Sequence, residues 1–99
     1  MKIRAGCLAV SLVALTGIAA NAQTVTVSGC PVPGVESGCL VLRGSNNVTY
    51  NISGARPRPN IGQRGVRLTG TVSRRTSICQ QGIVLERISW TYTDQRCSQ

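Results

Sequence analysis

The sequence predicts a small all-β domain that is exported and held together by two disulfide bonds. Three observations lead to this prediction: apolar and polar residues alternate in several short segments, helical periodicity is nearly absent, and four cysteines remain after an N-terminal leader. Alternation with a period of two indicates strands, because successive side chains of a strand point to opposite faces of a sheet. A chain of 99 residues has room for one such domain.

The start of the chain has the features of a secretory signal peptide. Lys2 and Arg4 precede an apolar or small-residue run of about 14 residues over 7–20. The sequence Ala-Asn-Ala at 20–22 fits the small-x-small cleavage rule, which places the cut before Gln23. The run is shorter than the roughly 18–20 apolar residues that span a bilayer. We therefore expect a cleaved leader, and no transmembrane segment after cleavage.

Residues 1–22 are thus expected to be signal peptide, and residues 23–99 to form one domain. A lipoprotein is not expected, since its modified cysteine would follow the apolar run, whereas Cys7 precedes it. The even number of cysteines that remains is typical of disulfide pairing in an oxidising compartment. A periplasmic or secreted protein is the expected result.

The first three strands are marked by alternation and by turn residues. Valines alternate with threonine and serine in a first strand that is expected to end at Cys30. A compact apolar run at 39–43 and an alternating run at 48–53 flank the turn-forming sequence Gly-Ser-Asn-Asn at 44–47. The two runs are expected to pair as a hairpin.

A break follows at residues 54–65. Pro57 and Pro59 fix φ and lack backbone donors, so Arg56 to Pro59 should be extended and stiff rather than helical.

Two further strands are expected at 66–73 and 83–93. Gly70 falls on the inward face of the fourth strand, which indicates a bulge or sharp bend. The apolar face changes along the last strand, which predicts either a bulge near Glu86 or burial on both faces. A short extra strand is expected at 78–80.

Five main strands with glycine-marked bends and no crossover helix predict an antiparallel, strongly curved sheet. The fold we expect is a small five-stranded antiparallel barrel of the OB type, and a two-sheet sandwich is the alternative. Disulfides would staple this domain, because a chain of 77 residues over 23–99 builds only a small core.

Four segments of the mature chain resemble a family of short exported bacterial proteins of unknown function with an OB-like β-barrel domain. These segments are Gly34–Leu42, Tyr50–Gly54, Val66–Val72 and Ile78–Gly82. The resemblance covers nearly all of the mature chain, and the segments that contain cysteines are its most specific part. It implies the fold and the compartment, and it implies no activity.

The resemblance also implies a disulfide pairing. The simpler members are expected to keep only the counterparts of Cys39 and Cys79, so these two would pair with each other and Cys30 would pair with Cys97. The residues alone leave a rival open, in which Cys30 pairs with Cys39 and Cys79 with Cys97. Four cysteines allow three pairings, and their spacing does not choose among them.

No enzymatic activity is expected. The sequence has no histidine, which removes the usual general base and any Ser–His or Cys–His nucleophile. The three acidic residues are Glu36, Glu86 and Asp94, and nothing in their positions pairs two of them across a cleft. The chain has no C-x-x-C pair, phosphate-binding loop or metal-ligand cluster, so no metal or other cofactor is expected.

Arginines make binding the expected function. After cleavage nine arginines face three acidic residues, a net charge of +6, which favours anionic neighbours. The candidate ligand-binding residues are Arg56, Arg58 and Arg64 around the prolines, with Arg67 on the next strand extending the patch. Guanidinium forks match the geometry of phosphate, sulfate and carboxylate groups. A merely solvated surface is the plainer alternative.

The candidate ligands are an anionic polysaccharide and an anionic lipid surface. A cell-envelope protein is the alternative partner, bound through a sheet edge or through the break at 54–65, which we call the proline segment. Nucleic acid is not expected, because single strands need several aromatic platforms. This chain has only Tyr50, Trp90 and Tyr92, and the alternation places Tyr50 and Trp90 in the core.

Overall fold

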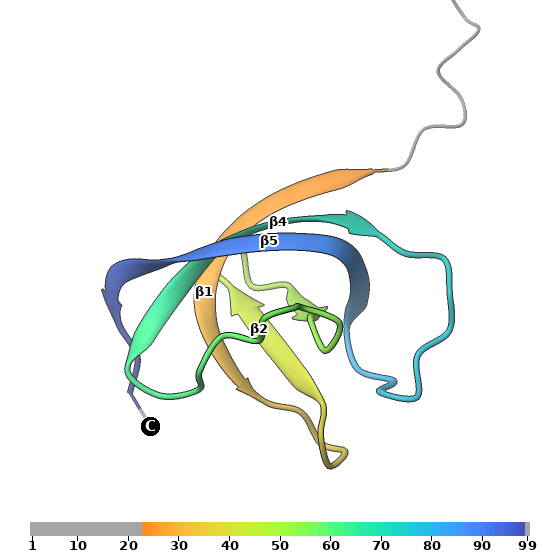
Figure 1. Ribbon diagram of the computed structural model, residues 1–99, viewed down its shortest axis with the longest axis horizontal. Helices are drawn as coiled ribbons and strands as arrows, with labels where there is room; N and C mark the ends of the chain where they lie inside the picture. The colour runs from red at the N-terminus through yellow and green to blue at the C-terminus, as the bar shows by residue number, and fades with distance from the viewer. Residues whose placement is uncertain (1–22, 99) are drawn as a thin grey trace, which may run out of the picture.

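The computed structural model describes residues 23–98 and contains five strands and no helix in that range (Figure 1). The strands are β1 (Thr24–Pro33), β2 (Leu40–Gly44), β3 (Thr49–Asn51), β4 (Arg64–Val72) and β5 (Ile83–Arg96). The all-β prediction is therefore confirmed. The predicted signal peptide, residues 1–22, lies outside the described residues.

The five strands form one sheet that closes on itself. Pairing runs in the order β1-β2-β3-β5-β4, and β4 pairs in turn with β1. Four of the five pairs are antiparallel, whereas β3 and β5 run parallel. The expectation of a fully antiparallel sheet is thus wrong. The reason is geometric: an odd number of strands cannot alternate in direction all the way around a closed ring, so one neighbouring pair must be parallel.

Strand β1 belongs to both halves of the sheet. Its residues 24–29 pair with β4 and its residues 29–33 pair with β2, so the two ladders meet at Gly29. A side chain at Gly29 would overlap the carbonyl oxygen of Arg43 on β2, which explains why glycine is needed at this close approach. The strand continues past the predicted end at Cys30 to Pro33, because β2 pairs with this second half.

The bulge predicted near Glu86 is present. Thr69 lies opposite Ser89 and Thr71 lies opposite Glu86, so β5 contributes one more residue than β4 over this interval. The extra residue is accommodated at Arg87, which has a φ of 54°. This shift allows residues on both sides of the bulge to face the interior, and it resolves the change of apolar face that the sequence shows.

Gly70 lies on the inner side of this bend, as predicted. A Cβ atom at Gly70 would lie 3.3 Å from the side chains of both Leu85 and Ile88, which flank the bulge. The absence of a side chain therefore lets β5 coil closely over β4.

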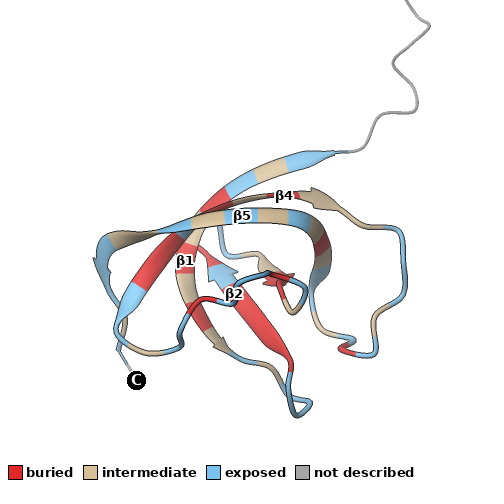
Figure 2. Ribbon diagram, viewed as in Figure 1, coloured by how far each residue is buried: buried red, intermediate tan, exposed pale blue. Residues whose placement is uncertain are grey.

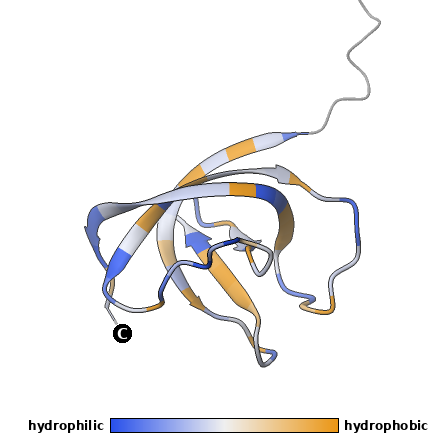
Figure 3. Cartoon of the chain, in the orientation of Figure 1, coloured by the Kyte–Doolittle hydropathy of each residue, from blue (hydrophilic) through white to orange (hydrophobic). Residues whose placement is uncertain are grey.

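The core lies inside the closed sheet. Figure 2 shows buried segments on β1, β2, β4 and β5, and Figure 3 shows that several of these segments are apolar. Its buried members are Val27, Leu40, Leu42, Tyr50, Ile52, Val66, Leu68 and Leu85. Trp90 and Tyr92 are partly buried and pack against this cluster from β5. The predicted core positions of Tyr50 and Trp90 are confirmed, with Trp90 less buried than Tyr50.

Two disulfides staple the sheet. Cys30 on β1 is bonded to Cys97 just after β5, with Cα atoms 5.8 Å apart. Cys39 just before β2 is bonded to Cys79 in the loop between β4 and β5, with Cα atoms 5.9 Å apart. This is the pairing that the resemblance implies, and the rival pairing is absent.

The short strand predicted at 78–80 is wrong. These residues form bends without a partner strand. Cys79 is buried by its disulfide, and its carbonyl oxygen accepts a hydrogen bond from the side-chain amide of Asn51 on β3. Ile78 points away from the domain and is 88% exposed. A side-chain amide and a disulfide, rather than a ladder of backbone hydrogen bonds, therefore hold this segment.

Candidate anion-binding site

The proline segment is fastened to β5 by two aromatic side chains. The indole nitrogen of Trp90 donates a hydrogen bond to the carbonyl oxygen of Pro57 (2.8 Å), and the hydroxyl oxygen of Tyr92 accepts one from the backbone N–H of Asn60 (3.0 Å). The rings of Trp90 and Tyr92 meet edge to face, with centroids 4.8 Å apart. The segment is not helical, as predicted, and the Arg56–Pro57 peptide bond is cis.

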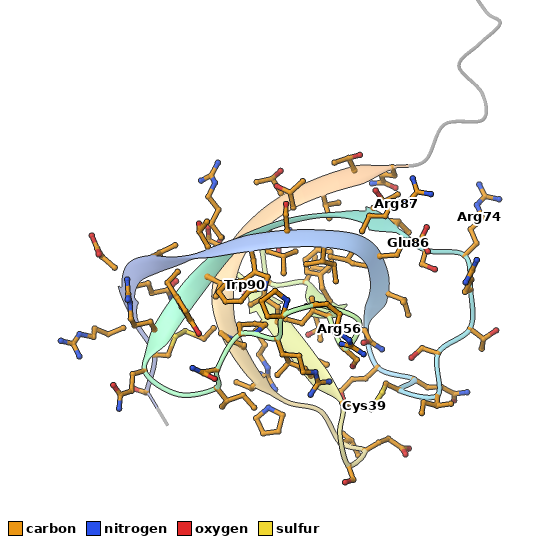
Figure 4. The ribbon with its side chains drawn as sticks, in the orientation of Figure 1. Cys39, Arg56, Arg74, Glu86, Arg87 and Trp90 are labelled. Carbon is orange, nitrogen blue, oxygen red and sulfur yellow. A yellow bond between two sulfur atoms is a disulfide. The ribbon has the colours of Figure 1, made fainter. Side chains whose placement is uncertain are left out.

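Arg56 and Arg58 brace the loops around this segment. Nη1 of Arg56 donates to the carbonyl oxygens of Ser53 and Ala55, at 3.1 and 2.7 Å. Nη2 of Arg58 donates to the carbonyl oxygens of Gly38 and Ser53, at 2.7 and 3.4 Å. Both arginines are exposed, and Figure 4 shows Arg56 above Cys39. Part of the donor capacity of each guanidinium is therefore already used by the protein.

Arg64 occupies a different environment at the start of β4. Its Nε donates to the carbonyl oxygen of Thr93 (3.1 Å), and its guanidinium carbon lies 5.2 Å from the centre of the Tyr92 ring. The hydrogen bond uses the Nε atom of Arg64, and one face of its guanidinium group makes a cation–π contact with the Tyr92 ring. These contacts leave the two terminal nitrogens of the fork available to a ligand.

Two hollows meet at Arg64. One has a volume of about 420 Å³ and is lined by residues 60–64 and Tyr92. The other has a volume of about 390 Å³ and is lined by Gln63, Arg64, Asp94 and Arg96. Because Gln63 and Arg64 line both, the two hollows adjoin each other on the same end of the β4–β5 ladder.

The second hollow contains two arginines that face each other. Arg64 and Arg96 are direct partners across the β4–β5 ladder. Like charges in this position repel, which is unfavourable for a strand pair. Asp94 lines the same hollow and supplies one opposing charge. An anion bound between the two guanidinium groups would relieve the remaining repulsion.

The end of β5 is held in place by the first disulfide. The backbone N–H of Cys97 donates to the carbonyl oxygen of Gln63 (3.0 Å), and Cys97 is bonded to Cys30. Arg96 precedes this anchor directly. Arg96 and Gln63 were not among the predicted binding residues. Gln63 is the sequence neighbour of Arg64, whereas no local pattern relates Arg96 to Arg64, because only the strand register brings Arg96 there from a distant part of the chain.

Of the four predicted ligand-binding arginines, one lines the two hollows. Arg64 lines both hollows, whereas Arg56, Arg58 and Arg67 line neither. Arg67 is exposed on β4, with Ser28 and Thr91 as its neighbours on the adjoining strands. Arg56 and Arg58 thus bond to backbone carbonyls, Arg64 lines the hollows, and Arg67 is exposed on the face of β4.

Within residues 23–98, no group of three or more cysteine or acidic side chains is arranged to hold a metal ion. The same part of the chain contains no helix of the length and apolarity needed to cross a membrane.

Comparisons with family models, with curated proteins and with solved structures found no match. The resemblance to exported OB-like proteins therefore stays a prediction.

Proposed function

We propose that this protein is an exported anion-binding module with an OB-type barrel, and that its binding site centres on Arg64 and Arg96. Support for the OB type comes from the strand order β1-β2-β3-β5-β4 with closure onto β1, and from the division of β1 between two ladders. The two disulfides are compatible with the oxidising environment of the periplasm or the exterior.

The observation that carries this proposal is the opposition of Arg64 and Arg96 across two strands, at the rim of adjoining hollows. A guanidinium fork binds phosphate, sulfate or carboxylate through paired N–H donors, and two facing forks can hold one such group from both sides. Repulsion between the unliganded arginines would favour the bound state further. The expected ligand is the charged group of an anionic polysaccharide or of a lipid head group.

The usual binding face of OB modules is occupied in this protein. That face lies over strands 2 and 3, next to the loops that follow strands 1 and 4. Val41 and Asn51 are paired neighbours there, and they are only 1% and 2% exposed. The Asn51 amide donates to Ser77 and Cys79, so the loop between β4 and β5 covers this face. This arrangement argues against nucleic acid as the ligand and favours the hollows at Arg64 as the binding site.

The test is binding of a sulfated oligosaccharide of heparin type, measured by calorimetry at low salt. We expect Arg64→Gln and Arg96→Gln each to weaken binding about tenfold or more, because a hydrogen bond to a charged group contributes roughly 1.5–3 kcal/mol. Arg67→Gln is the matched control, since it removes the same charge from the exposed face of β4. Its effect should stay below about twofold at moderate salt, where long-range attraction is screened.

Two results would overturn the proposal. One is the absence of binding at low salt. The other is an equal loss for all three variants, since that would mean that net charge alone attracts the oligosaccharide.

A protein partner from the cell envelope is the alternative function. Every strand has a neighbour on both sides in the closed sheet, so the described residues offer little edge for strand addition. The proline segment is occupied by its contacts with Trp90 and Tyr92. A partner that co-purifies and survives moderate salt would support this alternative over the anion site.

A further inference from the structure

We propose that a second surface, separate from the Arg64 end, docks onto an anionic membrane. We call it the stapled tip and define it as residues 34–39 and 77–81, the two loop segments joined by the Cys39–Cys79 disulfide. The tip contains the two most exposed large apolar side chains of the described domain, Val35 at 85% and Ile78 at 88%.

The tip holds these side chains rigidly. The backbone N–H of Val35 donates to the side-chain carbonyl of Gln81 (2.9 Å), which bridges the two segments. Gly34 and Cys39 close the first segment, with the N–H of Gly34 donating to the carbonyl oxygen of Cys39 (2.8 Å). Single exposed aliphatic residues are ordinary on a protein surface. Val35 and Ile78 are different in that both are almost fully exposed and lie on two adjoining loops that a disulfide cross-links, so one surface can contact both loops at once.

The two segments approach each other beside the closed sheet. In Figure 1 the loop after β1 extends below the strands, the loop after β4 leaves the sheet to the right and then turns downward, and Figure 4 places Cys39 between them. The disulfide and the Gln81 bridge show that this proximity is real and not an effect of the view.

Two arginines adjoin the tip. Arg58 donates to the carbonyl oxygen of Gly38 within the tip, and it shares the carbonyl oxygen of Ser53 with Arg56. One acidic residue, Glu36, is the sequence neighbour of Val35 and opposes their charge. Exposed aliphatic side chains near arginines match a bilayer surface, where acyl chains lie beneath anionic phosphates. The net charge of +6 over residues 23–99 adds attraction at longer range.

This inference does not depend on the proposed function. None of the tip residues lines the hollows at Arg64, so each surface can be tested without altering the other.

The experiment is co-sedimentation of the oxidised protein with vesicles of phosphatidylglycerol and phosphatidylcholine, and with vesicles of phosphatidylcholine alone. We expect binding to the mixed vesicles and little binding to the neutral ones. The double variant Val35→Ser/Ile78→Ser should lower the partition coefficient about tenfold or more, since both side chains would leave water on docking. Both positions are exposed, so the variant is expected to fold, which circular dichroism would verify.

Three further variants sharpen the result. Ile83→Ser removes an exposed apolar side chain that belongs neither to the tip nor to the hollows at Arg64, and it should change binding less than twofold. Arg64→Gln/Arg96→Gln should lower vesicle binding less than Val35→Ser/Ile78→Ser does, because these two arginines line the second hollow and do not belong to the tip. Glu36→Gln should strengthen binding to the anionic vesicles by removing the one repelling charge of the tip.

The inference is overturned if the wild-type protein ignores anionic vesicles, or if the serine variant binds them as the wild type does. It is also overturned if only the Arg64→Gln/Arg96→Gln variant loses vesicle binding, which would assign the lipid to the other site. Failure of the wild-type protein to bind the oligosaccharide, together with normal vesicle binding, would instead count against the proposed function alone.

Discussion

Trp90 and Pro57 are joined by a hydrogen bond of 2.8 Å from the indole nitrogen to the carbonyl oxygen. The bond lets one side chain serve two purposes, because the ring packs against the core while its polar edge fastens the long connection between β3 and β4. The closed sheet is thus coupled to the loop that leads to Arg64.

Trp90→Phe is expected to lower the free energy of unfolding by about 1 kcal/mol. The substitution keeps an aromatic ring in the core but removes the donor to Pro57, and a single hydrogen bond contributes about this amount. Urea denaturation measures the change. Tyr92→Phe is the companion variant, since it removes only the acceptor for Asn60. Unchanged stability in both variants would show that these bonds do not hold the loop.

Gly29→Ala should destabilise the domain by more than about 3 kcal/mol or prevent folding, because the new Cβ atom would overlap the backbone of Arg43. A backbone atom in the middle of a ladder cannot move aside cheaply. Gly54→Ala is the matched control: it has open space around it, and its effect should stay within about 0.5 kcal/mol. Thermal unfolding of both variants measures the difference in their stabilities. Equal stabilities would mean that β1 does not approach the backbone of β2 at Gly29 as closely as described.

Removing either disulfide should cost about 4 kcal/mol by the loop-closure relation, since the bridges span 67 and 40 residues. The local consequences should differ. Replacing Cys39 and Cys79 by alanine should release residues 77–81 and speed their amide hydrogen exchange, because only side-chain hydrogen bonds would still hold them.

Replacing Cys30 and Cys97 by alanine is the control for that experiment. It should leave the exchange of residues 77–81 slow and instead speed exchange near Gln63, which the N–H of Cys97 contacts. Identical exchange patterns in the two variants would contradict separate roles for the two bridges.

Arg96→Gln is expected to leave the melting temperature unchanged or slightly raised, while it weakens anion binding. The substitution removes one of two like charges that face each other across the ladder, which relieves repulsion in the free protein. Melting curves with and without excess sulfated oligosaccharide test both parts. The ligand should raise the melting temperature of the wild type more than that of the variant. A lower melting temperature for the free variant would indicate that Arg96 has a structural role.

Much of the fold follows from local pattern. Alternation located the strands, the glycine at position 70 and the change of face in the last strand located the bulge, and the proline-rich break marked a non-helical connection. Local pattern also produced errors. It predicted a short strand at 78–80, where a disulfide and an amide hold the chain, and it ended the first strand at Cys30 instead of Pro33. Alternation alone also gave no sign that a closed ring of five strands needs one parallel pair.

The candidate site was found only in part. Clustering in the sequence drew attention to the arginines from 56 to 67, yet only Arg64 of the predicted set lines a hollow. Its partner, Arg96, belongs to the far end of the chain. The tip was missed as well, because the exposure of Val35 and Ile78 depends on loops that a disulfide brings together.

The sequence by itself determined the strand content, the positions of the bends and the positive charge, because these depend on residue type and on spacing along a short segment. The tertiary structure alone decided which arginines stand together, which face of the sheet is covered, and which apolar side chains remain exposed. Those properties arise from strand register and cross-links, which join residues that no local spacing relates.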